Sequence, residues 1–213
     1  MVEITVDVWS DLVCPWCFIG KRRFEAALEG FEHRDAVRVR WRSFELDPNA
    51  PTEAVERAPE LLQRKYGMTA EQAAEANARV TAIAAEVGLT YRLDESWPVN
   101  SFDAHRVMHF AVDQGVGDAV RERLMTAYTS EGVALGDRET LVAEVTKAGL
   151  DEAATWEVLK GDRYADAVRA DEREAAEIGV RGVPAFVANG RYLVSGAQPV
   201  EVFERLLKKA AEG

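Results

Sequence analysis

Alternating apolar and polar positions near both ends of the chain predict the strands of one sheet. Apolar residues at every second position predict a strand over residues 2–9 and another over residues 37–43. Near the C-terminus, residues 185–195 contain two short apolar runs separated by Asn189-Gly190, a dipeptide typical of a tight β-hairpin. Together these segments predict a mixed sheet with strands from the two ends of the chain.

A helical period governs the remaining sequence. A helix is predicted from Phe18 to about Leu28, directly after the first strand, and another around residues 164–178. From the end of the second strand to about residue 163, the sequence shows no convincing strand pattern. Four residues there have the side chains and spacing of helix starts, namely Thr69, Ser101, Asp137 and Asp151. A last helix opens at Gln198-Pro199.

The composition divides the chain into three segments. Asp47-Pro48-Asn49-Ala50-Pro51 is a turn-rich stretch of the kind found at boundaries. We therefore expect residues 1–47 and 164–213 to form one α/β domain with a mixed central sheet, and residues 48–163 to form an all-helical insertion within it.

Charge and hydropathy exclude several classes of function. The 213 residues include 26 Lys and Arg against 37 Asp and Glu, a formal net charge of −11. Because this charge repels phosphate backbones and anionic lipids, we expect neither nucleic acid nor a membrane as a partner. The arginines Arg38, Arg40 and Arg42 are expected to be solvated side chains on one strand face. No signal-peptide pattern or long apolar run is visible, so a cytoplasmic location is expected.

The chain has two cysteines, Cys14 and Cys17, where the first strand gives way to the first helix. A bridge between them closes too short a loop to act as a structural staple. At such a junction, unpaired backbone N–H groups and the helix dipole favour a thiolate at Cys14. The spacing brings Cys17 close enough to attack a mixed disulfide formed at Cys14. Pro15 fits a first helical turn, and Trp16 can cover the pair while meeting a partner.

Val183-Pro184 is the second part of the candidate site, because it follows two glycines and opens the third strand. A proline there is a candidate for a cis peptide bond, since it lacks the donor that a central strand needs. Beside the cysteines, it would leave the backbone of Val183 free to pair with an extended substrate whose disulfide meets Cys14. A carboxylate beneath the pair could accept the proton of Cys17, and Asp7 is the candidate by position, with Asp11 as runner-up.

Four segments of the sequence resemble the FrnE-like branch of the DsbA-like thioredoxin-fold family. They are residues 9–21 with the Cys-Pro-Trp-Cys motif, residues 44–48 (Phe-Glu-Leu-Asp-Pro), residues 100–106 (Asn-Ser-Phe-Asp-Ala-His-Arg), and residues 182–190 (Gly-Val-Pro-Ala-Phe-Val-Ala-Asn-Gly). The resemblance covers nearly the whole chain and implies a thioredoxin-like fold with a helical insertion.

That resemblance also implies a thiol–disulfide oxidoreductase that oxidises, reduces or isomerises disulfides. Cys14 would be the nucleophile, Cys17 the resolving cysteine and Pro184 the cis-proline. The implied partners are protein or small-molecule thiols and disulfides. No cofactor is implied beyond a redox-active Cys14–Cys17 disulfide, although the family allows glutathione as a co-substrate and a homodimer as the assembly.

Two alternative hypotheses compete with this one. Glutathione-dependent isomerases and kappa-class transferases resemble the same fold, but they typically have serine where Cys14 stands. A zinc site would use Cys14, Cys17, His105 and His109, yet the wide sequence separation differs from compact zinc motifs, so no metal is expected. His105 and His109 are interpreted instead as residues of the core or of the cleft edge, and His105 is the candidate to line the active cleft and contact the substrate.

Overall fold

The computed structural model describes residues 3–213, so Val2, which the sequence places in the first strand, lies outside the described residues. The chain divides into two compact units. One comprises Met1–Leu46 together with Arg169–Gly213, and the other comprises Asp47–Val168. The first unit holds the sheet and both cysteines, and the second is helical.

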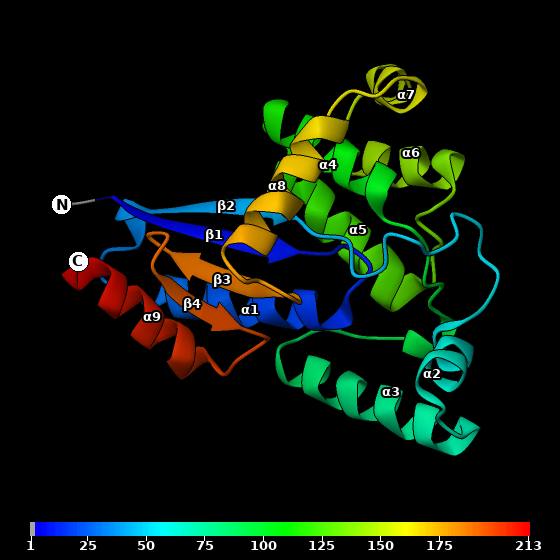
Figure 1. Cartoon of the computed structure of the whole chain (residues 1–213), viewed down its shortest axis with the longest axis horizontal. Coiled ribbons are helices and arrows are strands. Elements are labelled where there is room, and N and C mark those ends of the chain that lie inside the picture. Colours follow the sequence, from blue (N-terminus) through cyan, green and yellow to red (C-terminus); the bar gives the residue numbers. More distant parts are fainter. Residues whose placement is uncertain (1–2) are drawn as a thin grey trace. The chain divides into compact units, whose positions relative to one another are not determined.

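A four-stranded sheet with the order β2-β1-β3-β4 forms the centre of the first unit (Figure 1). β2 (Val37–Ser43) runs parallel to β1 (Ile4–Ser10). β3 (Ala185–Ala188) and β4 (Tyr192–Ser195) form a hairpin, and β3 is antiparallel to β1. The predicted mixed sheet is therefore confirmed. The Asn189-Gly190 turn between β3 and β4 has positive φ at both residues, as a tight hairpin of this kind requires.

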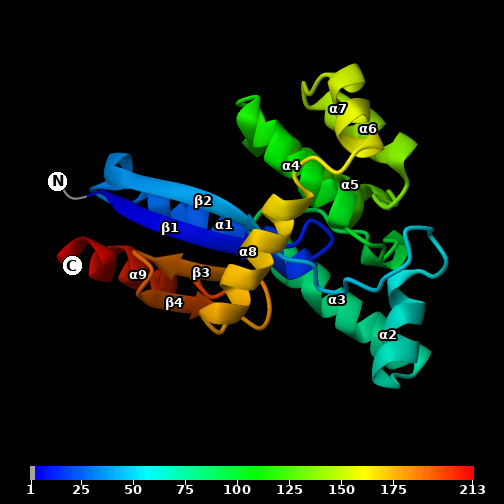
Figure 2. The same ribbon diagram turned by 45° about the horizontal axis from the view of Figure 1, so that its top comes forward.

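Helices α1 (Pro15–Glu29) and α9 (Val200–Glu212) pack on one face of this sheet. Figure 2 shows α9 beside the β3–β4 hairpin. The rings of Phe24, Phe186 and Phe203, from α1, β3 and α9, meet with centroids 4.6 to 5.8 Å apart. This aromatic cluster fixes α1, and with it the segment that bears the cysteines, against the sheet.

The opposite face of the sheet is joined to α8 (Ala165–Glu177) through Asp171. The Asp171 carboxylate accepts a hydrogen bond from the backbone N–H of Ser43 (2.9 Å) and one from Arg42 (3.1 Å). The Asp171 carbonyl accepts another from the indole N–H of Trp9 (2.9 Å). Three points of the first two strands are thus tied to one buried residue of the helix.

The second unit contains helices and, among its residues 47–168, no strand, as predicted. Its helices are α2 (Ala58–Tyr66), α3 (Ala70–Glu86), α4 (Phe102–Asp113), α5 (Gly117–Glu131), α6 (Arg138–Lys147) and α7 (Glu152–Lys160). Short 3₁₀ turns add Arg34–Ala36 in the first unit and Leu93–Glu95 in the second. Within the part of the chain that the structure describes, no helix has both the length and the apolar character needed to cross a bilayer.

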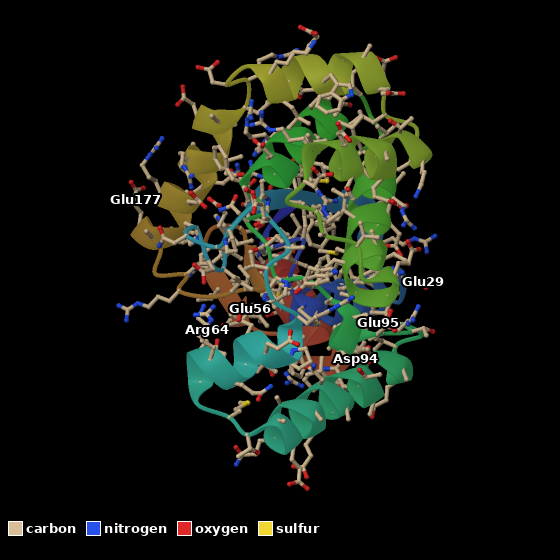
Figure 3. The ribbon with its side chains drawn as sticks, turned by 90° about the vertical axis from the view of Figure 1, so that its right-hand side faces the viewer. Glu29, Glu56, Arg64, Asp94, Glu95 and Glu177 are labelled. Atoms are coloured by element: carbon tan, nitrogen blue, oxygen red, sulfur yellow. The ribbon has the colours of Figure 1, made fainter. Side chains whose placement is uncertain are left out.

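Two local features of the helical unit differ from the sequence interpretation. Helix α2 was not predicted, although Pro59 in its first turn and Gly67 with φ of 67° at its end are typical helix boundaries. Figure 3 shows Glu56 and Arg64 of this region, which form an ion pair. Ser101 stands at the start of α4 but makes no side-chain capping bond. Asn100 replaces it, because its side-chain oxygen accepts from the Phe102 N–H (2.9 Å).

Candidate active site

The cysteines occupy the first turn of α1. Cys14 has an extended backbone and is the N-cap residue, Pro15 is the first helical residue, and the N–H of Cys17 donates to the carbonyl of Cys14 (3.0 Å). No side chain caps this helix end. The positive end of the helix dipole therefore lies at the cysteine pair, without a neighbouring carboxylate cap to neutralise it.

The two cysteines and Trp16 differ in exposure. Cys17 is fully buried, Cys14 is 3% exposed and Trp16 is 39% exposed. Both thiols are free, and no disulfide joins them in this structure. Along the chain, an exposed aromatic residue therefore separates two buried thiols.

Burial raises the pKa of the Cys17 thiol well above the usual range, and the neighbouring Cys14 thiol raises it further. Two groups act in the opposite direction. The backbone N–H of Asp11 donates to Cys17 Sγ at 3.4 Å, and both this bond and the Ser10 hydroxyl lower the Cys17 pKa. Burial has the largest effect, so Cys17 stays protonated in the reduced protein at neutral pH.

Asp7, predicted as the proton acceptor, is not brought to the cysteines. Side chains alternate across a strand, and Val6 and Val8 face the side on which α1 packs, so Asp7 faces the other side. There its carboxylate oxygens are held by Arg40 (2.9 and 2.7 Å) and Arg42 (2.8 Å). Because Asp7 lies on the face of β1 opposite α1 and binds two arginines of β2, its carboxylate cannot reach Cys17.

The same ion pairs correct the interpretation of the β2 arginines as merely solvated. The Arg42 side chain is only 24% exposed and bridges Asp7 to Asp171. Arg40 is half exposed and binds Asp7 as well. Arg38 alone of the three pairs at the exposed surface, with Glu3.

Asp11, the second candidate for the proton acceptor, contacts Cys17 with its backbone N–H and not with its carboxylate. Its carboxylate accepts from the N–H of Leu46, just beyond β2 (2.8 Å), and from the N–H of Val13 (3.4 Å). These bonds hold the β1–α1 loop in the shape that points the Asp11 N–H at the Cys17 sulfur. The residue therefore positions the loop.

Pro184 lies directly against α1. The Val183–Pro184 peptide bond is cis. A β-carbon built on Gly20 would stand only 2.8 Å from Cγ of Pro184, so glycine is required for this close approach. Gly20 follows Cys17 by less than one helical turn. The structure thus brings the predicted proline and the cysteine helix together.

The two histidines of α4 bear on the predicted substrate contact and on the zinc hypothesis. His105 is buried in α4, and its contact with a substrate stays a prediction. His109 stacks on Tyr164, with ring centroids 6.2 Å apart. Among residues 3–213, no three His, Cys, Asp or Glu side chains gather closely enough to hold a metal ion.

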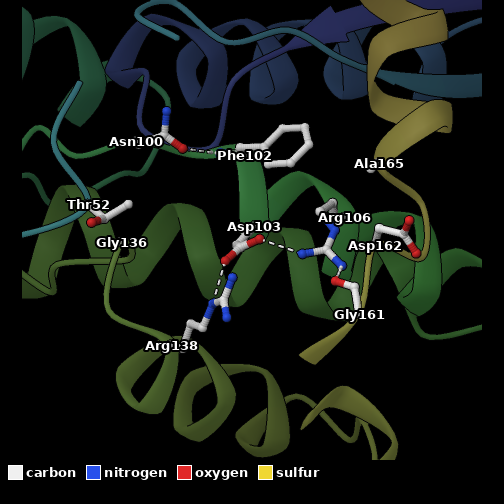
Figure 4. Close-up of a pocket in the computed structure, with 10 residues that line it drawn as sticks. All are labelled: Thr52, Asn100, Phe102, Asp103, Arg106, Gly136, Arg138, Gly161, Asp162 and Ala165. Atoms are coloured by element: carbon white, nitrogen blue, oxygen red, sulfur yellow. Dashed lines mark hydrogen bonds and ion pairs between the residues drawn. The ribbon is translucent and has the colours of Figure 1, made fainter. Parts of the chain in front are cut away.

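The helical unit has its own cavity of about 360 Å³, which Figure 4 shows. Asn100, Phe102, Asp103 and Arg106 line it, whereas His105 does not. The Asp103 carboxylate pairs with Arg106 and Arg138, and Asp162 adds a second carboxylate, so the lining carries two acidic and two basic side chains. The other donors of Arg106 bind backbone carbonyls, which makes this residue part of the packing of the unit.

The family model for the DSBA-like thioredoxin domain matches residues 5–208, nearly the whole chain. The chain belongs to this family. As a DSBA-like protein it is an enzyme of the thiol–disulfide oxidoreductase kind, and the cysteine pair at the start of α1 agrees with that chemistry.

Three relatives illustrate the match. YwbO of Bacillus subtilis, an uncharacterized protein, is 28% identical over 97% of this chain and 96% of its own length. The crystal structure of the probable DsbA oxidoreductase SCO1869 from Streptomyces coelicolor has a TM-score of 0.95 and 43% identity, covering 99% of this chain and 91% of that one. The cytosolic disulfide reductase DsbM from Pseudomonas aeruginosa with GSH shares the fold, with a TM-score of 0.65 and 17% identity over 98% and 100% of the two chains.

In this DSBA-like protein, replacing Gly20 with Ala is expected to destabilise the fold by about 1–2 kcal/mol. Alanine favours a helix interior by up to about 1 kcal/mol, but the forced displacement of Pro184 and its loop costs more. Denaturant unfolding measures the change. Gly30→Ala is the matched control, because a β-carbon there meets only carbonyl oxygens at 3.9 Å. An equal effect of both substitutions would disprove the tight Gly20–Pro184 contact.

Sequence reasoning missed Gly20, Ser10 and the backbone of Asp11 as parts of this site. For Gly20 a signal existed, since a glycine inside a helical pattern usually has a packing reason. For the other two none existed, because their contact with Cys17 depends on how the β1–α1 loop is folded.

Proposed function

We propose that the protein catalyses thiol–disulfide exchange on protein or small-molecule disulfides, with Cys14 as the nucleophile and Cys17 as the resolving cysteine. The observation that supports it is the arrangement of these cysteines in the first turn of α1, with Pro184 against the same helix at Gly20. The Cys14 thiolate attacks a substrate disulfide, and Cys17 then attacks the mixed disulfide and releases the product thiol.

The substrate would bind along Val183 and Trp16. Among the described residues, neither the N–H nor the carbonyl of Val183 has a hydrogen bond, so both are free to pair with an extended peptide. Trp16 and Leu46, 39% and 46% exposed, offer apolar surface to its side chains. Pro15 is proposed only to shape the start of the helix. We assign no substrate contact to Pro15 or to Asp7.

Glutathione is the proposed small-molecule co-substrate, and the cytoplasm is the proposed compartment. The Pseudomonas relative, which is described as a cytosolic disulfide reductase and was solved with GSH, supports both proposals. With two cysteines in the whole chain, the protein has no second pair to relay electrons. An external thiol must therefore restore the dithiol after a substrate is reduced, and an external disulfide must restore the Cys14–Cys17 disulfide after a substrate is oxidised.

An exchange assay in both directions tests the proposal. The purified protein is added to a peptide with one disulfide in reduced glutathione, and to the dithiol peptide in oxidised glutathione. The expected result is catalytic acceleration of at least one direction by protein with free thiols and none by protein alkylated at its cysteines. No acceleration in either direction would refute the proposed function.

The second step of the reaction is expected to become faster with rising pH. Burial raises the pKa of Cys17, only its thiolate is a nucleophile, and the thiolate fraction grows about tenfold per pH unit below that pKa. Rapid-mixing kinetics of the reduced protein with a small aromatic disulfide resolve the release of the second leaving group. A rate that is already constant between pH 6 and about 8 would contradict the raised pKa.

A further inference from the structure

The hydroxyl of Ser10 is a buried polar group without an evident structural use. Ser10 is the last residue of β1 and is 6% exposed. Its Oγ has no hydrogen-bond partner of ordinary geometry among the described residues. An unpaired buried hydroxyl costs free energy, so such a group is retained for a reason other than stability or is merely tolerated.

The position of Ser10 suggests the reason. By strand alternation it shares the face of β1 with Val8, on which α1 packs, and it directly precedes Asp11, whose N–H donates to Cys17 Sγ at 3.4 Å. The Ser10 hydroxyl lies close enough to Cys17 to lower its pKa. The Asp11 carboxylate bonds to Leu46 and Val13 fix this turn of the chain.

We propose that the Ser10 hydroxyl and the Asp11 backbone N–H form a two-donor site for the Cys17 thiolate. This inference rests on the proposed function and assigns Ser10 a part in its second step. The hydroxyl is unpaired while Cys17 is a thiol, and it turns its proton toward the sulfur when negative charge develops there.

The site acts in both directions of the exchange. When a substrate is reduced, the Cys17 thiol gives its proton to a solvent base, and its thiolate attacks Cys14 Sγ of the mixed disulfide. The Cys14–Cys17 bond forms, the bond from Cys14 to the substrate sulfur breaks, and the substrate leaves as a thiolate that solvent protonates. In the reverse direction a substrate thiolate attacks Cys14, and Cys17 leaves as the thiolate. The substrate sulfur is reduced and the Cys17 sulfur oxidised in the first case, and the reverse holds in the second.

Removing the donor is expected to slow the second step by about three- to tenfold. A hydrogen bond to a charged group changes an equilibrium by roughly ten- to a hundredfold. Losing the bond lowers the fraction of Cys17 present as thiolate by this factor. The rate falls by only about the square root of it, because a more basic thiolate is also a better nucleophile. At neutral pH Cys17 is a thiol in the reduced protein and part of a disulfide in the oxidised protein, so the bond to its thiolate stabilises neither end state. Its loss therefore slows both directions alike and leaves the reduction potential unchanged.

Ser10→Thr and Ser10→Val provide the test, because threonine and valine have nearly the same shape and differ in the hydroxyl. Reduced protein is mixed with excess 5,5′-dithiobis(2-nitrobenzoate), and thionitrobenzoate release is followed in time. The first phase reports attack by Cys14 and the second reports attack by Cys17. We expect an unchanged first phase in both variants, and a second phase that is slowed, with its pH profile displaced upward, in Ser10→Val but not in Ser10→Thr.

The outcomes separate this inference from the proposed function. If the wild type shows no second phase, the proposed role of Cys17 fails. If the wild type shows both phases and the two variants match it, or if both variants are slowed alike, the hydroxyl has no such part and the inference is overturned. Ser10→Ala supplies a folding check, because removing an unpaired hydroxyl is expected to leave thermal stability equal to the wild type or higher.

Discussion

Replacing Cys14 with Ser is expected to abolish disulfide exchange, with a loss of roughly a thousandfold or more in the rate of the first step. A serine hydroxyl is a weak nucleophile unless a base activates it, whereas a cysteine sulfur is intrinsically strongly nucleophilic. The remaining cysteine, Cys17, is fully buried and cannot replace Cys14 as the attacking group. The measurement is the initial rate of attack on a disulfide peptide.

Cys17→Ala is the matched control, because it removes the same number of thiols and leaves the first attack intact. The two variants are expected to differ sharply: the first loses the attack, and the second performs it once and stops. A Cys14→Ser protein that retains its activity would favour the glutathione-dependent isomerase or transferase hypothesis, in which serine occupies this place.

Replacing Asp171 with Ala is expected to lower the free energy of unfolding by about 3 kcal/mol. The substitution leaves the buried N–H of Ser43 without its acceptor and removes one of the carboxylates that neutralise Arg42. Breaking a buried ion pair on one side costs about 3–5 kcal/mol, and the value here is lower because Arg42 is partly exposed and keeps Asp7. This is a large part of the 5–15 kcal/mol that stabilises a typical domain.

Glu177→Ala is the control for Asp171, since Glu177 is exposed on the same helix and is expected to change stability by less than about 0.5 kcal/mol. Denaturant unfolding of both variants gives the comparison. A loss of less than about 1 kcal/mol for Asp171→Ala would show that the Asp171 carboxylate contributes little to holding α8 against the sheet.

Patterns with local causes could be predicted from the sequence. The alternation of residues 37–43 and the Asn189-Gly190 turn follow from backbone geometry, and both are found in the structure as predicted. The cysteines at the junction of β1 and α1 are also a local pattern, because a strand and a helix directly flank them. The FrnE-like branch stays a prediction.

Features that depend on packing between distant segments could not be predicted. The alternation of β1 gives Asp7 a face, but only the fold shows that α1 packs on the other face and that two arginines of β2 meet the carboxylate. Likewise, the contact of Gly20 with Pro184 joins positions far apart in the chain. Helix α2 was not predicted, because the segment between Pro59 and Gly67 is short and has few apolar residues to mark a helical period.

The claim that Cys14 attacks and Cys17 resolves is tested most directly by trapping the intermediate between the two steps. Cys17→Ala protein is incubated with a disulfide peptide and analysed intact and after proteolysis by mass spectrometry, without reductant. The predicted result is one peptide bound per protein through a disulfide at Cys14, and no lasting adduct on the wild type, because Cys17 releases it. Absence of an adduct on Cys17→Ala, or an equally stable adduct on the wild type, would contradict this account.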